Sequence, residues 1–346
     1  MTYFGVLGKT PDLSLEELKK VKPTNVVSKW GIVFFDTELP DLLSGLGGLI
    51  KWWIIVNHEE LGSYLEGCKI VWVDSQELGL MMKRKFGIRR YKELDLRKSD
   101  LDVKRKGIEI RLLWKKEYGV VLGWQNIDLY SAIDFEKPTH GMQIGMMPSK
   151  LAHILVNIGL WLADKVVQTV YDPFCGFGTT NFIANTLGHH TIGSDINITS
   201  SKQNLPRWKK QSFFKEEPFM TFFKHDVNDP FEKAFLDHVD VIVSEGWLGP
   251  VIKSDMHKHK TQTETILKEY LPSIVELYKI FLSNIKQKMP NTPIVMTIPE
   301  YLRLDDPVIA NRIKEHAQML WYEVEYLGDV YSRKKQQVGR RVVIFR

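Results

Sequence analysis

The sequence predicts an α/β domain with a mostly parallel sheet, preceded by a smaller α+β domain. Residues 166–195 run through an apolar strand, a glycine turn, a helix and a second strand, which is the repeating unit of a parallel sheet. Residues 239–243 form an apolar run around one acid, which is typical of a strand buried on both faces. A polar, basic turn before the apolar residues 342–345 predicts a hairpin at the end.

Length and composition fit two ordinary domains. With 346 residues, 44% of them hydrophobic, the chain has enough material for two cores. Its two cysteines, Cys68 and Cys175, lack the spacing of a zinc site or a disulfide framework, so we expect no metal and a reducing, cytoplasmic location. The N-terminus lacks the features of a signal peptide, and the apolar run at residues 46–56 is too short for a membrane helix.

Residues 1–128 are predicted to form the α+β domain. Residues 3–7 and 31–35 have the composition of strands, and Ser14 is placed to cap a helix over residues 15–21. The adjacent residues Trp52 and Trp53 cannot face the same side of a strand, so we expect one in the core and the other exposed.

A basic segment lies between residues 83 and 116. It holds fourteen Lys or Arg against five Asp or Glu, a local excess of nine where the whole chain carries +5. A surface that follows nucleic-acid phosphates requires such an excess, because each neutralised phosphate releases counterions. The alternative is a solvated face that keeps the protein soluble. Neighbouring aromatic residues favour nucleic acid, and the predicted contacts are Lys83, Arg84, Lys85, Arg89, Arg90, Lys104, Arg105 and Lys106.

A polar connection at residues 129–145 is predicted to link the first domain to a second domain at residues 146–346. Pro148 suits the first turn of a helix, and apolar residues repeat at helical spacing from Leu151 to Leu162. We expect this helix to pack against the sheet.

The central motif is the turn between the first two strands of the second domain. Residues 172–173 end the first strand, and Gly176 and Gly178 permit a tight turn that brings the backbone close to a ligand. Thr179 begins the helix, and Asp195 ends the next strand, where an open α/β sheet places the acid that binds a ribose. A P-loop is excluded because no Lys follows the last glycine.

Residues 172–179, DPFCGFGT, resemble the first motif of the class I (Rossmann-like) S-adenosylmethionine-dependent methyltransferases. Asp195 stands at the position of that family's ribose-binding acid. Asp226 follows a predicted strand and matches the segment that meets the adenine amino group; the alternative is a cap on its own turn. The resemblance implies S-adenosylmethionine as cofactor. The cofactor-binding residues that it implies are Asp172, Phe174, Cys175, Gly176, Gly178, Thr179, Asp195, Ile196, Asp226, Val227 and Pro148.

The segment at residues 244–250, SEGWLGP, stands where amino-group methyltransferases carry (D/N)PPY. In those enzymes an oxygen accepts a hydrogen bond from the exocyclic amine, and an aromatic ring stacks on the flipped base. Here Glu245 replaces the acid, Gly246 the proline and Trp247 the aromatic residue. The resemblance implies Ser244, Glu245 and Trp247 as catalytic residues, with direct in-line attack and no covalent enzyme intermediate.

Two other stretches resemble THUMP-associated tRNA guanosine-N2 methyltransferases of the position-ten type. One is MMPSKLAHILVNIG at residues 146–159, which in that family frames the methionine end of the cofactor. The other is the end of the chain, from residue 331, which is similar to the family's YxRxxQxVGRxI. The resemblance covers residues 130–346 and implies methylation of guanosine N2, with tRNA or another structured RNA as partner. Residues 1–128 are only loosely similar to the ferredoxin-like and THUMP region of that family, which implies that the first domain binds RNA.

Two other functions are compatible with these patterns. A DNA adenine-N6 or cytosine-N4 methyltransferase has nearly the same catalytic domain, and its partner is DNA. A catalytically degenerate RNA-binding or scaffold protein keeps the fold after losing the chemistry at SEGWLGP. The sequence does not identify an activating partner subunit.

Overall fold

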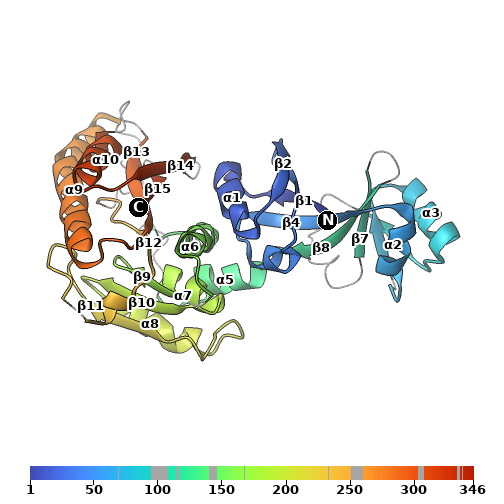
Figure 1. Ribbon diagram of the computed structural model, residues 1–346, viewed down its shortest axis with the longest axis horizontal. Coiled ribbons are helices and arrows are strands. Elements are labelled where there is room, and N and C mark those ends of the chain that lie inside the picture. Colours follow the sequence, from blue (N-terminus) through green and yellow to red (C-terminus); the bar gives the residue numbers. More distant parts are fainter. Residues whose placement is uncertain are drawn as a thin grey trace. The chain divides into compact units, whose positions relative to one another are not determined.

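The computed structural model describes residues 1–68, 70–94, 108–113, 117–139, 146–166, 168–232, 234–250, 260–302, 308–332, 336 and 338–346. The chain divides into two compact units, Met1–Asn126 and Ile127–Arg346 (Figure 1). Helix α5, Ile127–Phe135, begins the second unit and occupies the first part of the segment that we expected to be a linker. Along the described chain, no helix combines the length and apolarity needed to cross a lipid bilayer.

The first unit contains a mixed sheet whose eight described strands lie in the order β2-β3-β1-β4-β8-β7-β5-β6. Strand β5 is parallel to β6 and β7, and the other pairs are antiparallel. The strands are β1 Thr2–Leu7, β2 Thr24–Lys29, β3 Ile32–Asp36, β4 Leu49–Val56, β5 Val71–Val73, β6 Tyr91–Glu93, β7 Ile108–Leu112 and β8 Tyr118–Trp124. The helices are α1 Pro11–Leu18, α2 His58–Leu65 and α3 Gln76–Phe86.

Helices α1, α2 and α3 share one apolar core with the sheet, through buried residues such as Leu18, Leu61 and Met82. Helix α1 begins at Pro11 rather than at residue 15, because proline fits the first helical position, where its missing N–H costs nothing. Ser14 therefore lies inside the helix, where its hydroxyl donates to the Thr10 carbonyl at 3.0 Å instead of capping the helix.

Trp52 and Trp53 on β4 are both buried, so the expectation that one of them would be exposed was wrong. Trp52 belongs to the core that the helices cover. Trp53 faces a second apolar cluster, where its ring stacks on Phe4 with 4.6 Å between the ring centroids. The alternation of the two side chains was predicted correctly, but this second buried face was not.

A buried ion pair joins two strands of the first unit that are not neighbours. The Lys51 Nζ on β4 lies 2.8 Å from the Glu109 Oε2 on β7, across the intervening strand β8. The Arg111 Nε donates to the other oxygen of Glu109, also at 2.8 Å. Both oxygens of this fully buried carboxylate therefore have a cationic partner, which offsets the cost of removing the charge from water.

The second unit contains a sheet whose seven described strands lie in the order β11-β10-β9-β12-β13-β15-β14. The pairs from β11 to β13 are parallel, and β15 is antiparallel to β13 and β14. The mostly parallel sheet and the C-terminal hairpin are thus confirmed. The strands are β9 Thr169–Asp172, β10 His190–Asp195, β11 Met220–Lys224, β12 Val241–Glu245, β13 Ile294–Tyr301, β14 Val324–Tyr331 and β15 Val338–Phe345. The helices after α5 are α6 Ser149–Ala163, α7 Thr179–Thr186, α8 Thr199–Trp208, α9 Lys260–Lys288 and α10 Val308–Met319.

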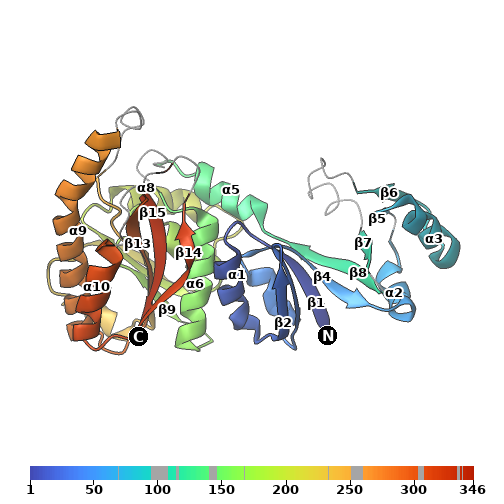
Figure 2. The same cartoon turned by 90° about the horizontal axis from the view of Figure 1, so that it is seen from above.

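Helices cover both faces of this sheet. Figures 1 and 2 show α9 and α10 on one side of it and α6 on the other. Residues Phe281 of α9 and Ile313 of α10 share a buried core with the strands. On the opposite face, α6 approaches closely at Gly159, where an added Cβ would lie 2.7 Å from Val243. The absence of a side chain at Gly159 therefore permits the close packing of α6 on β12.

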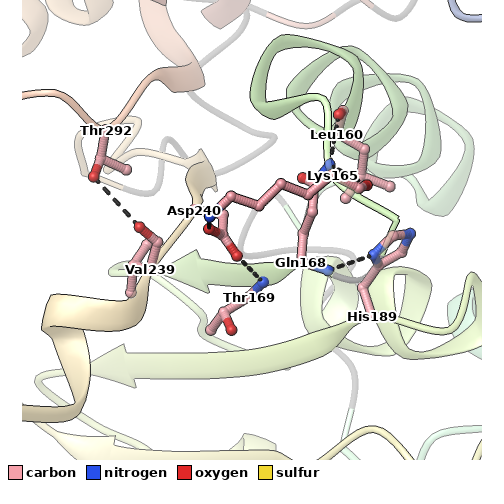
Figure 3. A network of polar contacts seen from close by, with 8 residues as sticks. All are labelled: Leu160, Lys165, Gln168, Thr169, His189, Val239, Asp240 and Thr292. Atoms are coloured by element: carbon pink, nitrogen blue, oxygen red, sulfur yellow. Dashed lines mark hydrogen bonds and ion pairs between the residues drawn. The ribbon is translucent and has the colours of Figure 1, made fainter.

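Polar contacts fix the amino ends of β9 and β12 (Figure 3). Asp240, just before β12, accepts the Thr169 N–H at 2.8 Å and forms an ion pair with Lys165. The Gln168 amide donates to the carbonyls of Leu160, at 2.8 Å, and Lys165, at 2.9 Å. These contacts lie at the end of the sheet opposite to the carboxyl ends of the strands, so we assign them a structural role.

The strand order creates a crevice at the carboxyl ends of the strands. From β9 the chain goes to β10 on one side, whereas β12 lies on the other side of β9. From β12 the chain goes on to β13, farther from β9. The loops that follow β9 and β12 therefore lead away from each other, and in open α/β sheets a ligand site lies between two such loops.

We expect Lys51→Met to lower the free energy of unfolding by about 3 kcal/mol, because breaking a buried pair leaves a carboxylate short of a partner. Urea unfolding of the full chain, followed by tryptophan fluorescence, measures this loss. The double variant Lys51→Met with Glu109→Gln removes both charges and should recover most of the stability. A loss in the double variant as large as in the single variant would contradict this account.

Candidate active site

The turn between β9 and α7 presents backbone to the crevice. Asp172 ends β9, and its Oδ1 accepts the Phe174 N–H at 3.1 Å. The Gly178 N–H donates to the Cys175 carbonyl at 2.7 Å. Gly176 and Gly178 have φ angles of 46° and 83°, a left-handed conformation that favours glycine. Gly178 is also the N-cap of α7, so the turn leads directly into the N-terminus of that helix.

Asp195 ends the neighbouring strand β10 and fastens this turn. Its Oδ2 accepts the Gly176 N–H at 3.0 Å, and its Oδ1 accepts the Asn197 N–H at 3.0 Å. Partial burial raises the pKa of Asp195, although the hydrogen bonds from the backbone oppose the shift. The next residue, Ile196, is 62% exposed and offers an apolar surface beside the acid.

A buried hydrogen bond joins the ends of β9 and β12. The Ser244 hydroxyl donates to the Asp172 Oδ1 at 2.6 Å, and both side chains are buried. Burial raises the pKa of Asp172 to about 7, against the opposing effect of its hydrogen bonds. Ser244, which we expected to be catalytic, thus contacts another protein side chain behind the crevice.

Glu245 ends β12 and is paired with a buried arginine. Its Oε1 accepts a hydrogen bond from the Nε of Arg340 on β15, whose side chain is only 1% exposed. Arg340 was not expected as a partner, because 95 positions separate it from Glu245 in the chain. The pair places a fixed cation beside the acid that stands in the position of the (D/N)PPY acid.

Tyr278 of α9 explains why glycine, rather than proline, occupies position 246. A Cβ on Gly246 would lie 2.1 Å from the Tyr278 hydroxyl, which leaves no room for a proline ring. The same hydroxyl donates to the Trp247 carbonyl at 3.1 Å. Burial raises the pKa of Tyr278 well above its ordinary value, so the hydroxyl keeps the proton that it donates.

These groups surround one cavity of about 630 Å³, formed within the second unit at the carboxyl edge of the sheet. This volume is typical of small-molecule sites. The expected residues that line it are Asp172, Phe174, Cys175, Gly176, Thr179, Asp195, Ile196, Asp226, Val227, Glu245 and Trp247. Three expected residues that the structure describes, Pro148, Gly178 and Ser244, are not part of the lining. Lining residues that we did not expect include Met146, Phe177, Thr180, His225, Asn228, Leu248 and Leu277.

Asp226 lines the cavity after β11 and also stabilises its own turn. Its Oδ1 accepts the Asn228 N–H at 2.9 Å and the Asn228 side-chain amide at 2.8 Å. The structure therefore shows the turn cap, and the same residue is within reach of a ligand in the cavity.

A buried lysine that we did not expect lies behind the glycine turn. Lys137, which is 5% exposed, donates from its Nζ to the Thr179 Oγ1 at 3.0 Å and to the Met146 sulfur at 3.4 Å. Burial lowers the pKa of Lys137 to about 8, while the charge of Asp134 opposes the shift. Because Thr179 and Met146 line the cavity, this ammonium group lies just behind its wall.

The expected nucleic-acid contacts belong to the first unit. Lys83, Arg84 and Lys85 form the exposed last turn of α3, and Arg89 and Arg90 are exposed in the loop that follows. The other three expected contacts, Lys104, Arg105 and Lys106, lie outside the described residues. Another cavity, of about 840 Å³, adjoins Arg89 and Arg90.

Within the described ranges, no group of three His, Cys, Asp or Glu is placed to hold a metal ion. Both cysteines are free thiols. Cys175 is buried in the glycine turn, and burial raises the pKa of its thiol. A buried, protonated thiol is a poor nucleophile, so we assign Cys175 no covalent role.

Comparisons with known proteins identify the fold. No protein-family model and no curated protein matches the sequence. TrmN from Thermus thermophilus is similar over 100% of both chains, with 17% sequence identity and a TM-score of 0.51. Trm5b from Pyrococcus abyssi matches 100% of this chain and 99% of its own, with 14% identity and a TM-score of 0.38. A putative RNA methyltransferase from Pyrococcus horikoshii matches 63% of this chain and 92% of its own, with 16% identity and a TM-score of 0.37. The second unit has the class I methyltransferase fold, as the sequence predicted.

Proposed function

We propose that this chain transfers a methyl group from S-adenosylmethionine to an exocyclic amino group of a nucleic-acid base, with guanosine N2 of tRNA as the substrate. The observation that carries the proposal is that Asp195 and Glu245 end two different strands and line one cavity. A cofactor-binding acid and an amine-binding acid have to share a cavity, because the methyl donor and the nitrogen acceptor must meet in line.

The groups around the glycine turn fit S-adenosylmethionine. Asp195 is a carboxylate suited to accept hydrogen bonds from ribose hydroxyls, and Ile196 supplies an apolar surface for adenine. Asp226 is suited to accept a hydrogen bond from the adenine amino group. The positive charge of Lys137 behind the turn favours the carboxylate of the methionine part. When bound, the cofactor supplies an electrophilic methyl group on a sulfonium.

The groups at the end of β12 fit a base that carries an amino group. Glu245 accepts hydrogen bonds, so it can hold the amine and aim the nitrogen lone pair toward the methyl group. Trp247 is 36% exposed at the cavity and provides a ring on which an extruded base can stack. In a direct in-line transfer, the new N–C bond would form as the bond between the methyl group and the sulfonium sulfur breaks, so S-adenosylhomocysteine would leave and the nitrogen would give up one proton. Such a transfer requires no enzyme nucleophile.

The first unit supports a nucleic-acid substrate. Five of its predicted contacts lie among the described residues, and they place exposed positive charge within one short stretch: Lys83, Arg84, Lys85, Arg89 and Arg90. An aromatic ring adjoins this charge, since the Lys83 Nζ lies 5.3 Å from the centroid of the Tyr91 ring. The resemblance of residues 130–346 to tRNA guanosine-N2 methyltransferases favours RNA over DNA.

We expect the wild-type protein to transfer label from radiolabelled S-adenosylmethionine to unmodified total tRNA, and Glu245→Gln to lower kcat by about 100-fold. The reason is that a glutamine carries no charge and holds the amine less well than a carboxylate. Asp195→Asn should weaken cofactor binding by about 10-fold, measured by calorimetry, because it loses an acceptor for charge-assisted hydrogen bonds.

Glu300→Gln is the matched control, because Glu300 is an acid of β13 outside the lining of the cavity. It should retain transfer. Nucleoside analysis of the product identifies the base, and duplex DNA is tested in parallel. Label in DNA but not in tRNA would favour the DNA methyltransferase alternative. Cofactor binding without transfer to either nucleic acid would favour a scaffold protein.

A triple change of Lys83, Arg84 and Lys85 to Gln should weaken tRNA binding and reduce the salt dependence of its affinity. We expect the slope of log K against log salt concentration to become shallower by about 2 to 3, because each of the three lost phosphate contacts removes roughly 0.7 to 0.9 of a counterion. The control is the same change at Lys202, Lys209 and Lys210, which are exposed on or just after α8. Equal effects of the two triple changes would refute a specific role for the end of α3.

Asp172→Asn should change how stability depends on pH. Burial raises the pKa of Asp172 from 3.8 to about 7, so between these values the unfolded chain loses this proton while the folded chain retains it. The stability of the wild type should therefore fall, relative to the variant, as the pH rises from about 4 to 7, by a few kcal/mol. Urea unfolding at several pH values measures this difference. A constant difference between the two proteins across this range would show that Asp172 titrates normally.

A further inference from the structure

Glu245 of β12 is paired with Arg340 of β15, a strand that is not adjacent to β12 in the sheet. Strand β13 lies between β12 and β15, with Thr297 opposite Glu245 and Pro299 opposite Arg340. The Arg340 side chain reaches past this intervening strand, and its Nε donates to the Glu245 Oε1. Only 1% of the arginine side chain and 16% of the glutamate side chain are exposed. The pair is therefore largely withdrawn from water at the point where Glu245 lines the cavity.

We propose that Arg340 is a positioning residue for methyl transfer, which keeps the Glu245 carboxylate ionised and aimed at the amino group of the base. This inference rests on the proposed function. An exocyclic amine needs an acceptor for its hydrogens, and an ionised carboxylate only accepts, whereas a protonated carboxyl group also presents a competing O–H. A cation in contact with a carboxylate stabilises its ionised form.

The length of the glutamate side chain explains why such a partner is needed. Glutamate has one more rotatable bond than the aspartate or asparagine of (D/N)PPY, so its carboxylate can occupy more positions. A guanidinium is planar and donates along fixed directions, so it restricts the orientation of a bound carboxylate. A carboxylate accepts about four hydrogen bonds in total, so its bond to Arg340 is compatible with a further bond from an amine.

The next residue on β15 provides a matched control. Arg341 donates from its Nε and Nη2 to Glu300 of β13, the Nη2 bond being 3.0 Å long. This pair has the same chemistry, but among the described residues neither Arg341 nor Glu300 lines the cavity. A structural contribution is therefore common to both pairs, whereas an effect on methyl transfer is expected only for Arg340.

The test measures methyl transfer from radiolabelled S-adenosylmethionine to unmodified total tRNA, with Arg340→Gln made in the wild-type and Glu245→Gln proteins. In the wild type we expect kcat to fall by about 100-fold, the loss associated with displacing a group in the active site by about 1 Å. In the Glu245→Gln protein we expect no further loss, because Arg340 acts through the carboxylate. Cofactor affinity should remain unchanged in both proteins, and Arg341→Gln should retain wild-type kcat.

The pH profile of kcat separates positioning from packing. The titratable groups next to Glu245 include Arg340 of β15 and Tyr278 of α9. Asp172 of β9, which is bonded to Ser244, is unchanged in every variant. Without the arginine, the carboxylate protonates more readily, so the acidic limb should move to higher pH in Arg340→Gln but not in Arg341→Gln. Arg340→Lys keeps the charge without the planar geometry, so it should lower kcat and leave the limb in place.

Equal losses in the two backgrounds, an unshifted acidic limb, or the same losses in Arg341→Gln would overturn the inference. If Arg340→Gln alone does not fold, two other variants test the inference by the same criteria. One is Arg340→Lys. The other is the double variant Glu245→Gln with Arg340→Gln, in which neither charge of the pair is left without a partner. Transfer by the wild type together with full activity of Arg340→Gln overturns this inference alone. Absence of transfer by the wild type to tRNA and to DNA overturns the proposed function and this inference with it.

Discussion

The hydrogen bond between Asp172 and Ser244 is the constraint on which the candidate site depends. Strands β9 and β12 pair in parallel at Val170 with Val241 and at Tyr171 with Ile242. The bond from Ser244 extends this contact to the carboxyl ends of both strands, inside the protein, where a hydroxyl or carboxyl group without a partner is costly. It therefore opposes any slip in register. With the register fixed, the glycine turn and the SEGWLGP segment leave the sheet at one edge and face one cavity.

The features that could be predicted from the sequence are those set by local chemistry. Gly176 and Gly178 adopt left-handed φ angles that other residues rarely take, so the turn is visible in the sequence. The apolar run before Ser244 became β12, because a strand buried on both faces needs continuous apolar residues. Asp195 and Glu245 each follow such an apolar run, so both could be placed at the ends of strands. Both line the cavity.

The features that could not be predicted depend on residues far apart in the chain. Arg340 is 95 positions from Glu245, and Lys137 is 42 positions from Thr179. The glycine at position 246 departs from (D/N)PPY, and its cause is the Tyr278 hydroxyl on another element. Periodicity and spacing describe single helices and strands, so they carry no information on which distant side chain fills the space beside a motif.

The proposed role of Glu245 as an acceptor for an amino group explains its ion pair with Arg340 better than a gain in folding stability does. Removing two charges from water costs several kcal/mol, and well-packed apolar side chains of similar size are often at least as stable. The Arg341–Glu300 pair, between β15 and β13, shows that such a pair can be structural, but only the Glu245 carboxylate of the two also lines the cavity. An acceptor for an amino group, by contrast, requires a carboxylate in a fixed place. Under the proposed function, the departures from (D/N)PPY at Glu245 and Gly246 are accommodated by Arg340, which pairs with the acid, and by Tyr278, which occupies the space beside the glycine.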